Sequence, residues 1–285
     1  MSFQNQFRTV ILLGALTGIL IWIGSFWGYS GMALAFIFAI LMNFGSYWFS
    51  DKIVLKIYRA KEIRESDNPR LFKIVKEVAQ LSKIPMPKVY IIPSQILNAF
   101  ATGRNVNHAA VAATEGILNA LGDSELKGVM AHEVSHIKNR DTLIQSISAT
   151  IAGVISYVAF MARWAALFGG MGGRDRDGGN TIELLVLAIL TPILATIIQL
   201  AISRSREYMA DEGAARILRS GSGLASALEK LEKGAKRMPL RPTSTTETTA
   251  HLFIVNPLRK GIFVNLFSTH PSVANRVKKL RSMQF

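Results

Sequence analysis

Two histidines and a glutamate stand at a spacing that suits a metal ion. His132, Glu133 and His136 form the pattern H-E-x-x-H within "AHEVSH". In an α-helix, residues four apart project from the same face, so both imidazoles can reach one tetrahedral ion. Glu133 lies beside that face, where its carboxylate can take a proton from a water molecule next to the ion. We predict one catalytic zinc ion, with His132 and His136 as ligands and Glu133 as general base. The alternative is a surface helix without metal.

Four apolar blocks separate the polar parts of the chain. They cover residues 9–27, 31–49, about 145–168 and 184–202, and each is long enough to cross the hydrocarbon core of a membrane. The first two contain no charged residue, whereas surface helices of soluble proteins keep a polar face. A cleaved signal peptide would have a shorter apolar core and no second block directly after it. We therefore predict four transmembrane helices.

Lysine and arginine are distributed unevenly around these blocks. Residues 50–141 hold fourteen of them and residues 203–285 hold fifteen, whereas the loop "GYS" has none. The loop 169–179 has two, each followed by an aspartate. Short cytoplasmic segments are enriched in these residues. We therefore expect both termini and both polar segments to be cytoplasmic.

A catalytic zinc ion needs a third protein ligand, and the chain has no cysteine to supply a thiolate. We predict Glu207, in "SRSREYMADEGA". His136 precedes the third block by about nine residues and Glu207 follows the fourth by about five, which places both about 10 Å from the same membrane face. Asp211, one turn beyond Glu207, and Asp141 could orient a ligand imidazole. Solvated helix charges explain these two aspartates equally well.

The formal net charge of +14 raises the question of nucleic-acid binding. The basic residues are scattered among acidic ones, without an arginine-rich run or a nucleic-acid motif, so we expect no nucleic-acid partner. Membrane topology and anionic lipid headgroups explain the charge more simply. Lys127, Lys138 and Arg140 also make the motif helix very costly to bury in lipid. The site is therefore expected in a cytoplasmic domain near the bilayer surface.

The polar segments show helix and strand patterns. Residues 68–84 have apolar residues at helical spacing behind Pro69. Three short β-like runs then predict a small sheet. Asp123 or Ser124 could cap the motif helix. We read 241–250 as a mobile loop without apolar periodicity. The β-like runs cover 88–92, 98–103 and 108–114, and further helical patterns cover 203–220 and 271–280.

The motif around His132, the segment around Glu207 and the stretch that begins at Asn98 together resemble a known family. "HEVSH" and "SRSREYMAD", preceded by "NAFATGRNVNHAAVA", resemble the HtpX family of bacterial membrane proteases, relatives of the CAAX prenyl proteases. The resemblance covers nearly the whole chain. It implies a zincin-like cytoplasmic domain in which His132, His136 and Glu207 bind zinc and Glu133 is the catalytic base.

The resemblance also suggests three substrate-binding residues. The family has a downstream His-Pro followed by an arginine, matched here by His270-Pro271 and Arg276. These groups are expected to stabilise the oxyanion of the tetrahedral intermediate. "NAFA", beginning at Asn98, resembles the edge strand that pairs with substrate backbone in zincins. From the residues alone, His270 could instead be a neighbour of a helix cap and Asn98 a turn residue.

We thus expect an α-helical integral membrane protein with an α+β zincin-like cytoplasmic metalloprotease domain. Its expected function is zinc-dependent endopeptidase activity in the bacterial inner membrane, on misfolded or damaged membrane proteins. A zinc-binding transporter and a catalytically inert membrane scaffold are the alternatives. Transport pathways usually carry ionisable residues at membrane depth, and the first, second and fourth blocks have none. The expected divisions are 1–50 and 143–202 in the membrane, and 51–142 and 203–285 in the cytoplasm.

Overall fold

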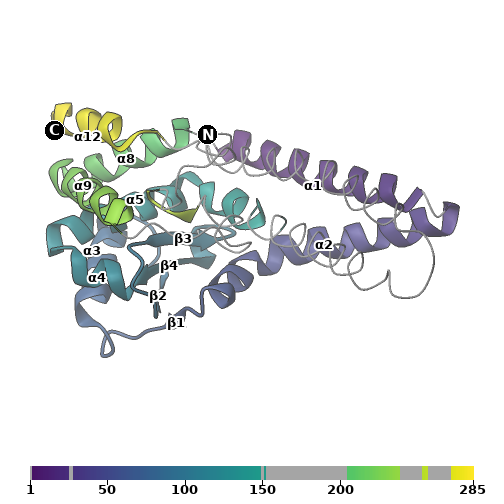
Figure 1. Ribbon diagram of the computed structural model, residues 1–285, viewed down its shortest axis with the longest axis horizontal. Helices are drawn as coiled ribbons and strands as arrows, with labels where there is room; N and C mark the ends of the chain where they lie inside the picture. The colour runs from purple at the N-terminus through teal and green to yellow at the C-terminus, as the bar shows by residue number, and fades with distance from the viewer. Residues whose placement is uncertain (1, 26–27, 149–150, 152–203, 238–251, 256–270) are drawn as a thin grey trace.

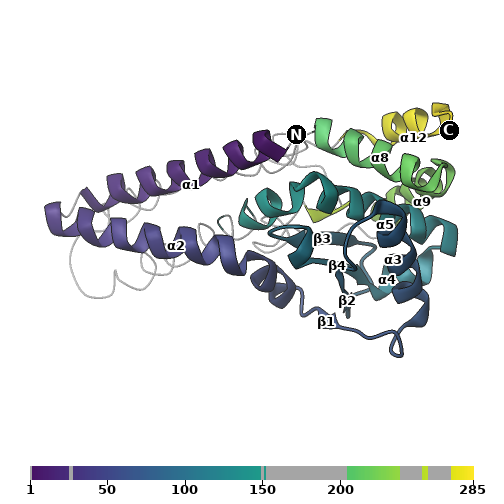
Figure 2. The same cartoon turned by 180° about the vertical axis from the view of Figure 1, so that it is seen from behind.

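The computed structural model describes residues 2–25, 28–148, 151, 204–237, 252–255 and 271–285. These residues form a long helical hairpin and a domain that combines helices with a sheet (Figure 1). The hairpin projects from one side of the domain, and the view from behind shows the same arrangement (Figure 2). The H-E-x-x-H motif and Glu207 both belong to the domain.

The hairpin consists of α1 (Ser2–Ser25) and α2 (Gly28–Ile57), which lie side by side. A polar contact joins them, because Asn43 Nδ2 donates a hydrogen bond to Thr17 Oγ1 at 2.8 Å. Large apolar side chains on α2, such as Leu41, are exposed. Among the described residues, α2 is the one helix found long and apolar enough to cross a membrane.

The predicted third and fourth spans fall almost entirely outside the described residues. Of the block 145–168, the structure describes residues 145–148 and 151, which are helical. The block 184–202 and the polar stretch 241–250 are not described. The count of four spans and the division into membrane and cytoplasmic parts therefore stay predictions.

A four-stranded sheet forms the middle of the domain, in the order β1-β2-β4-β3. β2 pairs with β4 in parallel, while β1 and β3 pair antiparallel with their neighbours. The sheet therefore leaves β3 at one edge. Three strands confirm the predicted runs, but β1 was not predicted, because two residues cannot show an alternating pattern. The strands are β1 (Lys61–Glu62), β2 (Lys88–Ile92), β3 (Ala99–Gly103) and β4 (Ala109–Thr114).

The two faces of the sheet belong to different apolar clusters. Successive side chains of a strand point to opposite faces. Ala101 and Val111 accordingly pack into the main core with the helices of the domain. Phe100 and Ala112 pack on the other face in a smaller cluster, together with Val54 from the end of α2. The hairpin is thus joined directly to the back of the sheet.

The remaining elements surround this sheet. α3 begins as predicted, because Pro69 is its first residue and the Asn68 side chain accepts a hydrogen bond from Leu71 N at 2.9 Å. The helices are α3 (Pro69–Ser82), η1 (Val106–His108), α4 (Glu115–Ala120), α5 (Asp123–Asn139), α8 (Arg204–Leu218), α9 (Ser222–Arg237) and α12 (Val273–Ser282).

The motif helix α5 begins differently from the prediction. Neither Asp123 nor Ser124 is its cap, because the helix already starts at Asp123. Glu125 instead accepts a hydrogen bond from Gly122 N at 2.9 Å, which satisfies one of the free backbone N–H groups at the helix start. Asp123 accepts from Arg70 Nε at 2.6 Å, which ties the start of α5 to α3.

Two glycines allow neighbouring helices to approach α5 closely. A Cβ atom at Gly213 of α8 would stand 2.7 Å from Ser135 Oγ, and one at Gly128 would stand 2.5 Å from the backbone N of Leu224 in α9. Glycine is the residue that permits such close approach. The contact at Gly213 holds α8 against α5 and so positions Glu207, which lies on the same helix.

Candidate active site

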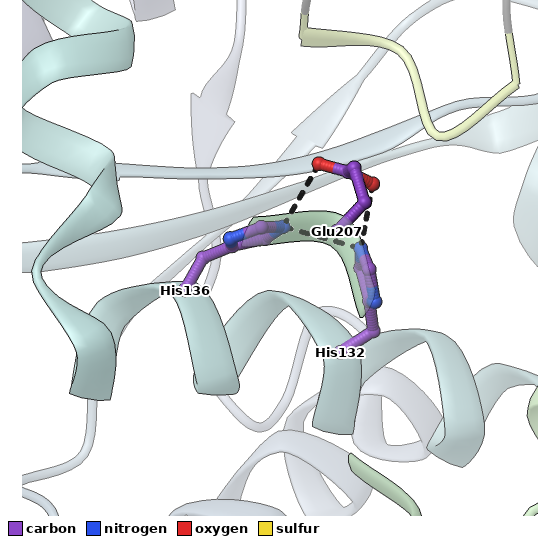
Figure 3. A group of neighbouring side chains, drawn as sticks. All are labelled: His132, His136 and Glu207. Atoms are coloured by element: carbon purple, nitrogen blue, oxygen red, sulfur yellow. Dashed lines mark hydrogen bonds and ion pairs between the residues drawn. The ribbon is translucent and has the colours of Figure 1, made fainter. Parts of the chain in front are cut away.

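His132, His136 and Glu207 come together at the crossing of α5 and α8 (Figure 3). The two Nε2 atoms of the histidines are 3.2 Å apart. Glu207 Oε2 lies 3.6 Å from His132 Nε2, and its Oε1 lies 3.5 Å from His136 Nε2. One donor atom from each residue lies within 4.8 Å of the others, and all three side chains are buried. The predicted ligand set therefore converges on one point, although 71 positions of sequence separate His136 from Glu207.

Each imidazole is held from behind by an aspartate. His136 Nδ1 lies 3.0 Å from Asp141 Oδ2, and His132 Nδ1 lies 3.0 Å from Asp211 Oδ1. A carboxylate that accepts the Nδ1 proton leaves the Nε2 lone pair for a metal ion. Both aspartates thus stand where a zinc site needs them, and the alternative of solvated helix charges is wrong, because both are buried.

Glu133 points its carboxylate toward the edge strand. Ala101 N of β3 donates a hydrogen bond to Glu133 Oε2 at 2.8 Å. Burial raises the pKa of Glu133, and the two neighbouring imidazoles only partly oppose this effect. A carboxyl group with a raised pKa is a better proton acceptor near neutral pH. Its position and proton affinity both suit a general base.

Arg276 of α12 lies behind Glu207 and Asp211. Its Nε and Nη2 donate to the two oxygens of Asp211 at 2.8 and 2.7 Å. Its Nη1 lies 3.5 Å from Glu207 Oε2 and donates to the backbone oxygen of Ile254 at 3.1 Å. The side chain of Arg276 is 1% exposed. The described contacts of this guanidinium are therefore with the protein's own carboxylates and backbone.

The electrostatics of the site suit a cation. Burial would lower the pKa of His136, but the hydrogen bond with Asp141 and the charge of Glu207 raise it to about 9. Burial would likewise raise the pKa of Asp211, but Arg276 holds it well below its usual range. The carboxylates of Glu207, Asp141 and Asp211 thus lie close enough to the two imidazoles to favour a cation between these groups. The donor set of two histidines and one carboxylate fits zinc.

A cleft opens onto this group of side chains. The space beside these side chains measures about 260 Å³, part of which is open solvent. Polar groups form the side toward α5 and α8, and apolar side chains form much of the rest. The lining residues are Phe100, His132, Glu133, His136, Gln145, Glu207, Leu252, Phe253 and Ile254.

The three residues predicted to bind substrate have different outcomes. Asn98 is buried and bonds to the backbone of residues 252 and 254. Arg276 lies in the site, where it contacts Asp211, Glu207 and the backbone of Ile254. His270 lies outside the described residues. Sequence reasoning did not find the cleft segment 252–255, although the apolar letters "LFIV" directly after a polar stretch are a signal for a buried segment.

Comparisons with known proteins identify the family of this chain. The profile of peptidase family M48 matches residues 65–284, which include every described residue of the site. The chain belongs to peptidase family M48. As a member of this family it is a metallopeptidase. A protease HtpX homologue from Syntrophotalea carbinolica is 56% identical over 281 residues, covering 98% of this chain and 99% of the relative.

Other M48 relatives extend the comparison. A protease HtpX homologue from Pyrococcus furiosus is 52% identical, covering 97% of this chain and 95% of the relative. Among solved structures, Ste24p of S. mikatae is similar with a TM-score of 0.52 at 17% identity. This chain is covered to 98% and spans 65% of the length of Ste24p. At this identity, the likeness to Ste24p is a likeness of fold.

Proposed function

We propose that this M48 peptidase is a zinc-dependent endopeptidase of the bacterial inner membrane. In this proposal it cleaves peptide bonds of misfolded or damaged membrane proteins at the cytoplasmic face. The observation that carries the proposal is the convergence of His132, His136 and Glu207 beside Glu133, at the edge of a sheet. A transporter does not need a general base at this position, and an inert scaffold needs neither a base nor an open cleft.

The residues of the site divide the chemistry among them. A zinc ion bound by His132, His136 and Glu207 would act as a Lewis acid. It would lower the pKa of water so that the water can give up a proton and act as a nucleophile at neutral pH. Glu133 accepts the proton of the attacking water and then returns it to the leaving amine. The Ala101 N–H group orients the Glu133 carboxylate for this task, since it donates to one carboxylate oxygen.

The edge strand β3 is the proposed place of the substrate backbone. A peptide in extended form can add to a sheet edge by main-chain hydrogen bonds, and β3 is the last strand on its side of the described sheet. Asn98 directly precedes this strand and Phe100 lines the cleft beside the metal-binding group. We retain His270 as the proposed donor to the developing oxyanion. Arg276 is better suited to positioning, because its nitrogens already contact Asp211, Glu207 and Ile254.

The membrane hairpin supports the proposed class of substrates. α2 is the candidate membrane helix among the described elements, and its end packs against the back of the sheet. The charged residues Lys52 and Lys56 follow its apolar part, as expected for the cytoplasmic side. A site tied so directly to the membrane would meet polypeptide that emerges from the bilayer. We propose a role in quality control on this basis.

The proposed function predicts metal-dependent cleavage. The full chain, purified in lipid nanodiscs and loaded with zinc, should cut an unfolded membrane protein into fragments visible by gel electrophoresis and mass spectrometry. Removal of the metal with a chelator should abolish cleavage, and stoichiometric zinc should restore it. Flux of zinc into sealed vesicles, without any cleavage, would favour the transporter instead.

A further inference from the structure

A short segment far along the chain closes one side of the active-site cleft. Residues 252–255 cross the open edge of the sheet at β3. Leu252 belongs to the small cluster on the back of the sheet, next to Phe100. Ile254, only two residues later, belongs to the main core on the other face. Phe253 stands between them, is 3% exposed, and lines the cleft.

Two buried side chains hold the backbone of this segment. Asn98 uses both ends of its amide, because Nδ2 donates to Leu252 O at 3.4 Å and Oδ1 accepts from Ile254 N at 3.3 Å. Arg276 Nη1 donates to Ile254 O at 3.1 Å. The backbone is therefore fixed on both sides of Phe253. Since Asp211 holds Arg276, the segment is also linked to the group around His132.

The lining of the cleft thus includes apolar residues from two segments of the chain, beside the polar groups of α5 and α8. Phe100 comes from the edge strand, while Leu252 and Phe253 come from the segment. An acidic substrate side chain would lose its hydration there and face the carboxylates of Glu133 and Glu207, which costs free energy. An apolar side chain of moderate size would instead be removed from water against the aromatic rings.

We propose that Phe253, together with Phe100 and Leu252, determines which substrate side chain is accepted beside the scissile bond. The accepted class is an apolar side chain in an extended peptide. Asn98 and Arg276 are positioning residues that keep Phe253 in place. This inference rests on the proposed peptidase function, and it goes further by naming the residues that select the substrate.

The test uses the zinc-loaded full chain and a series of quenched fluorescent peptides. The peptides differ only in the residues beside the cleaved bond, which are alanine, leucine, tryptophan or aspartate. The readout is the ratio of kcat/KM for the tryptophan peptide to kcat/KM for the leucine peptide. Phe253→Ala enlarges the cleft and should raise this ratio about tenfold, whereas Phe253→Trp should lower it by a similar factor.

Two further variants separate selection from general damage. Asn98→Asp keeps the acceptor for Ile254 N but loses the donor to Leu252 O. Phe253 is then held less firmly, so the preference for leucine over tryptophan should weaken and the ratio should move toward one. The zinc content should stay intact. Val255→Ala is the matched control, because Val255 packs on the main core and is not part of the cleft lining. It should leave the ratio unchanged.

The opposite signs expected for the two Phe253 variants cannot arise from loss of folded protein. The inference is overturned if both variants keep their zinc and show a ratio within about twofold of the wild type, well short of the change expected for a resized pocket. If the wild type itself cleaves none of the peptides while it holds zinc, the proposed function fails and this inference fails with it.

Discussion

Replacement of Glu133 by glutamine is expected to reduce kcat for peptide cleavage by about 10² to 10⁴, the usual contribution of a general base. Glutamine has the same shape and can still accept the hydrogen bond from Ala101 N, but it cannot take a proton from water. Zinc content should remain at the wild-type level, because Glu133 is not one of the three predicted ligands. Steady-state cleavage and elemental analysis of the same preparation measure both quantities.

A neighbouring glutamate supplies the control for this variant. Glu125 lies on the same helix and holds its start, through hydrogen bonds with Gly122 and Ser226. Glu125→Gln is expected to affect stability more than kcat. If Glu133→Gln keeps the full kcat, Glu133 is not the base, and the proposed mechanism is wrong. If Glu133→Gln loses its zinc, the loss of activity reflects the missing metal, and Glu133 is then needed to hold the metal site together.

Replacement of Arg276 by methionine is expected to lower the free energy of unfolding by about 3–5 kcal/mol, because it leaves buried carboxylates without their cation. Asp211 loses two hydrogen bonds, and Glu207 loses a positive charge at 3.5 Å. Zinc affinity should also fall, by about 10- to 100-fold, since Asp211 orients His132. Denaturant unfolding in detergent and competition with a zinc indicator measure the two effects.

The C-terminal helix offers a matched control for Arg276→Met. Arg281 lies on the same helix but is exposed, and it pairs with Glu229 at 2.9 Å. Arg281→Met should cost no more than about 1 kcal/mol, as surface ion pairs do. The double variant Arg276→Met with Asp211→Leu should recover part of the lost stability, because it removes the buried unpaired charge. A loss below about 1 kcal/mol for Arg276→Met would show that the buried pair contributes little, unlike most such pairs.

The metal-binding group was predictable because its signals are local or follow simple geometry. The spacing of His132 and His136 fixes their common helix face, and the matching distances of His136 and Glu207 from two apolar blocks bring them together. The strands 88–92, 98–103 and 108–114 were found for the same reason, since each has a pattern of its own. Local patterns therefore sufficed for most of the site.

Contacts between distant segments were beyond the reach of these patterns. No periodicity links Asn98 to residues 252 and 254, which bond to it across more than 150 positions of sequence. For Asp141 and Asp211, the sequence left two interpretations open, a carboxylate that orients an imidazole and a solvated surface charge. The choice depends on whether the aspartates are buried, and burial depends on the packing of α5 against α8. Likewise, the start of α5 was misplaced because the side chain of Glu125 acts from inside the helix.

Metal analysis of three proteins, wild type, His136→Ala and Glu207→Ala, purified under the same conditions, tests the proposed zinc site directly. We predict one zinc ion per wild-type chain and a loss of zinc from both variants, because each variant lacks one of the three protein ligands of the site. His136 and Glu207 come from different helices, so the comparison tests the ligands and the crossing of α5 and α8 together. Full retention of zinc by Glu207→Ala would remove Glu207 from the site and contradict the central claim.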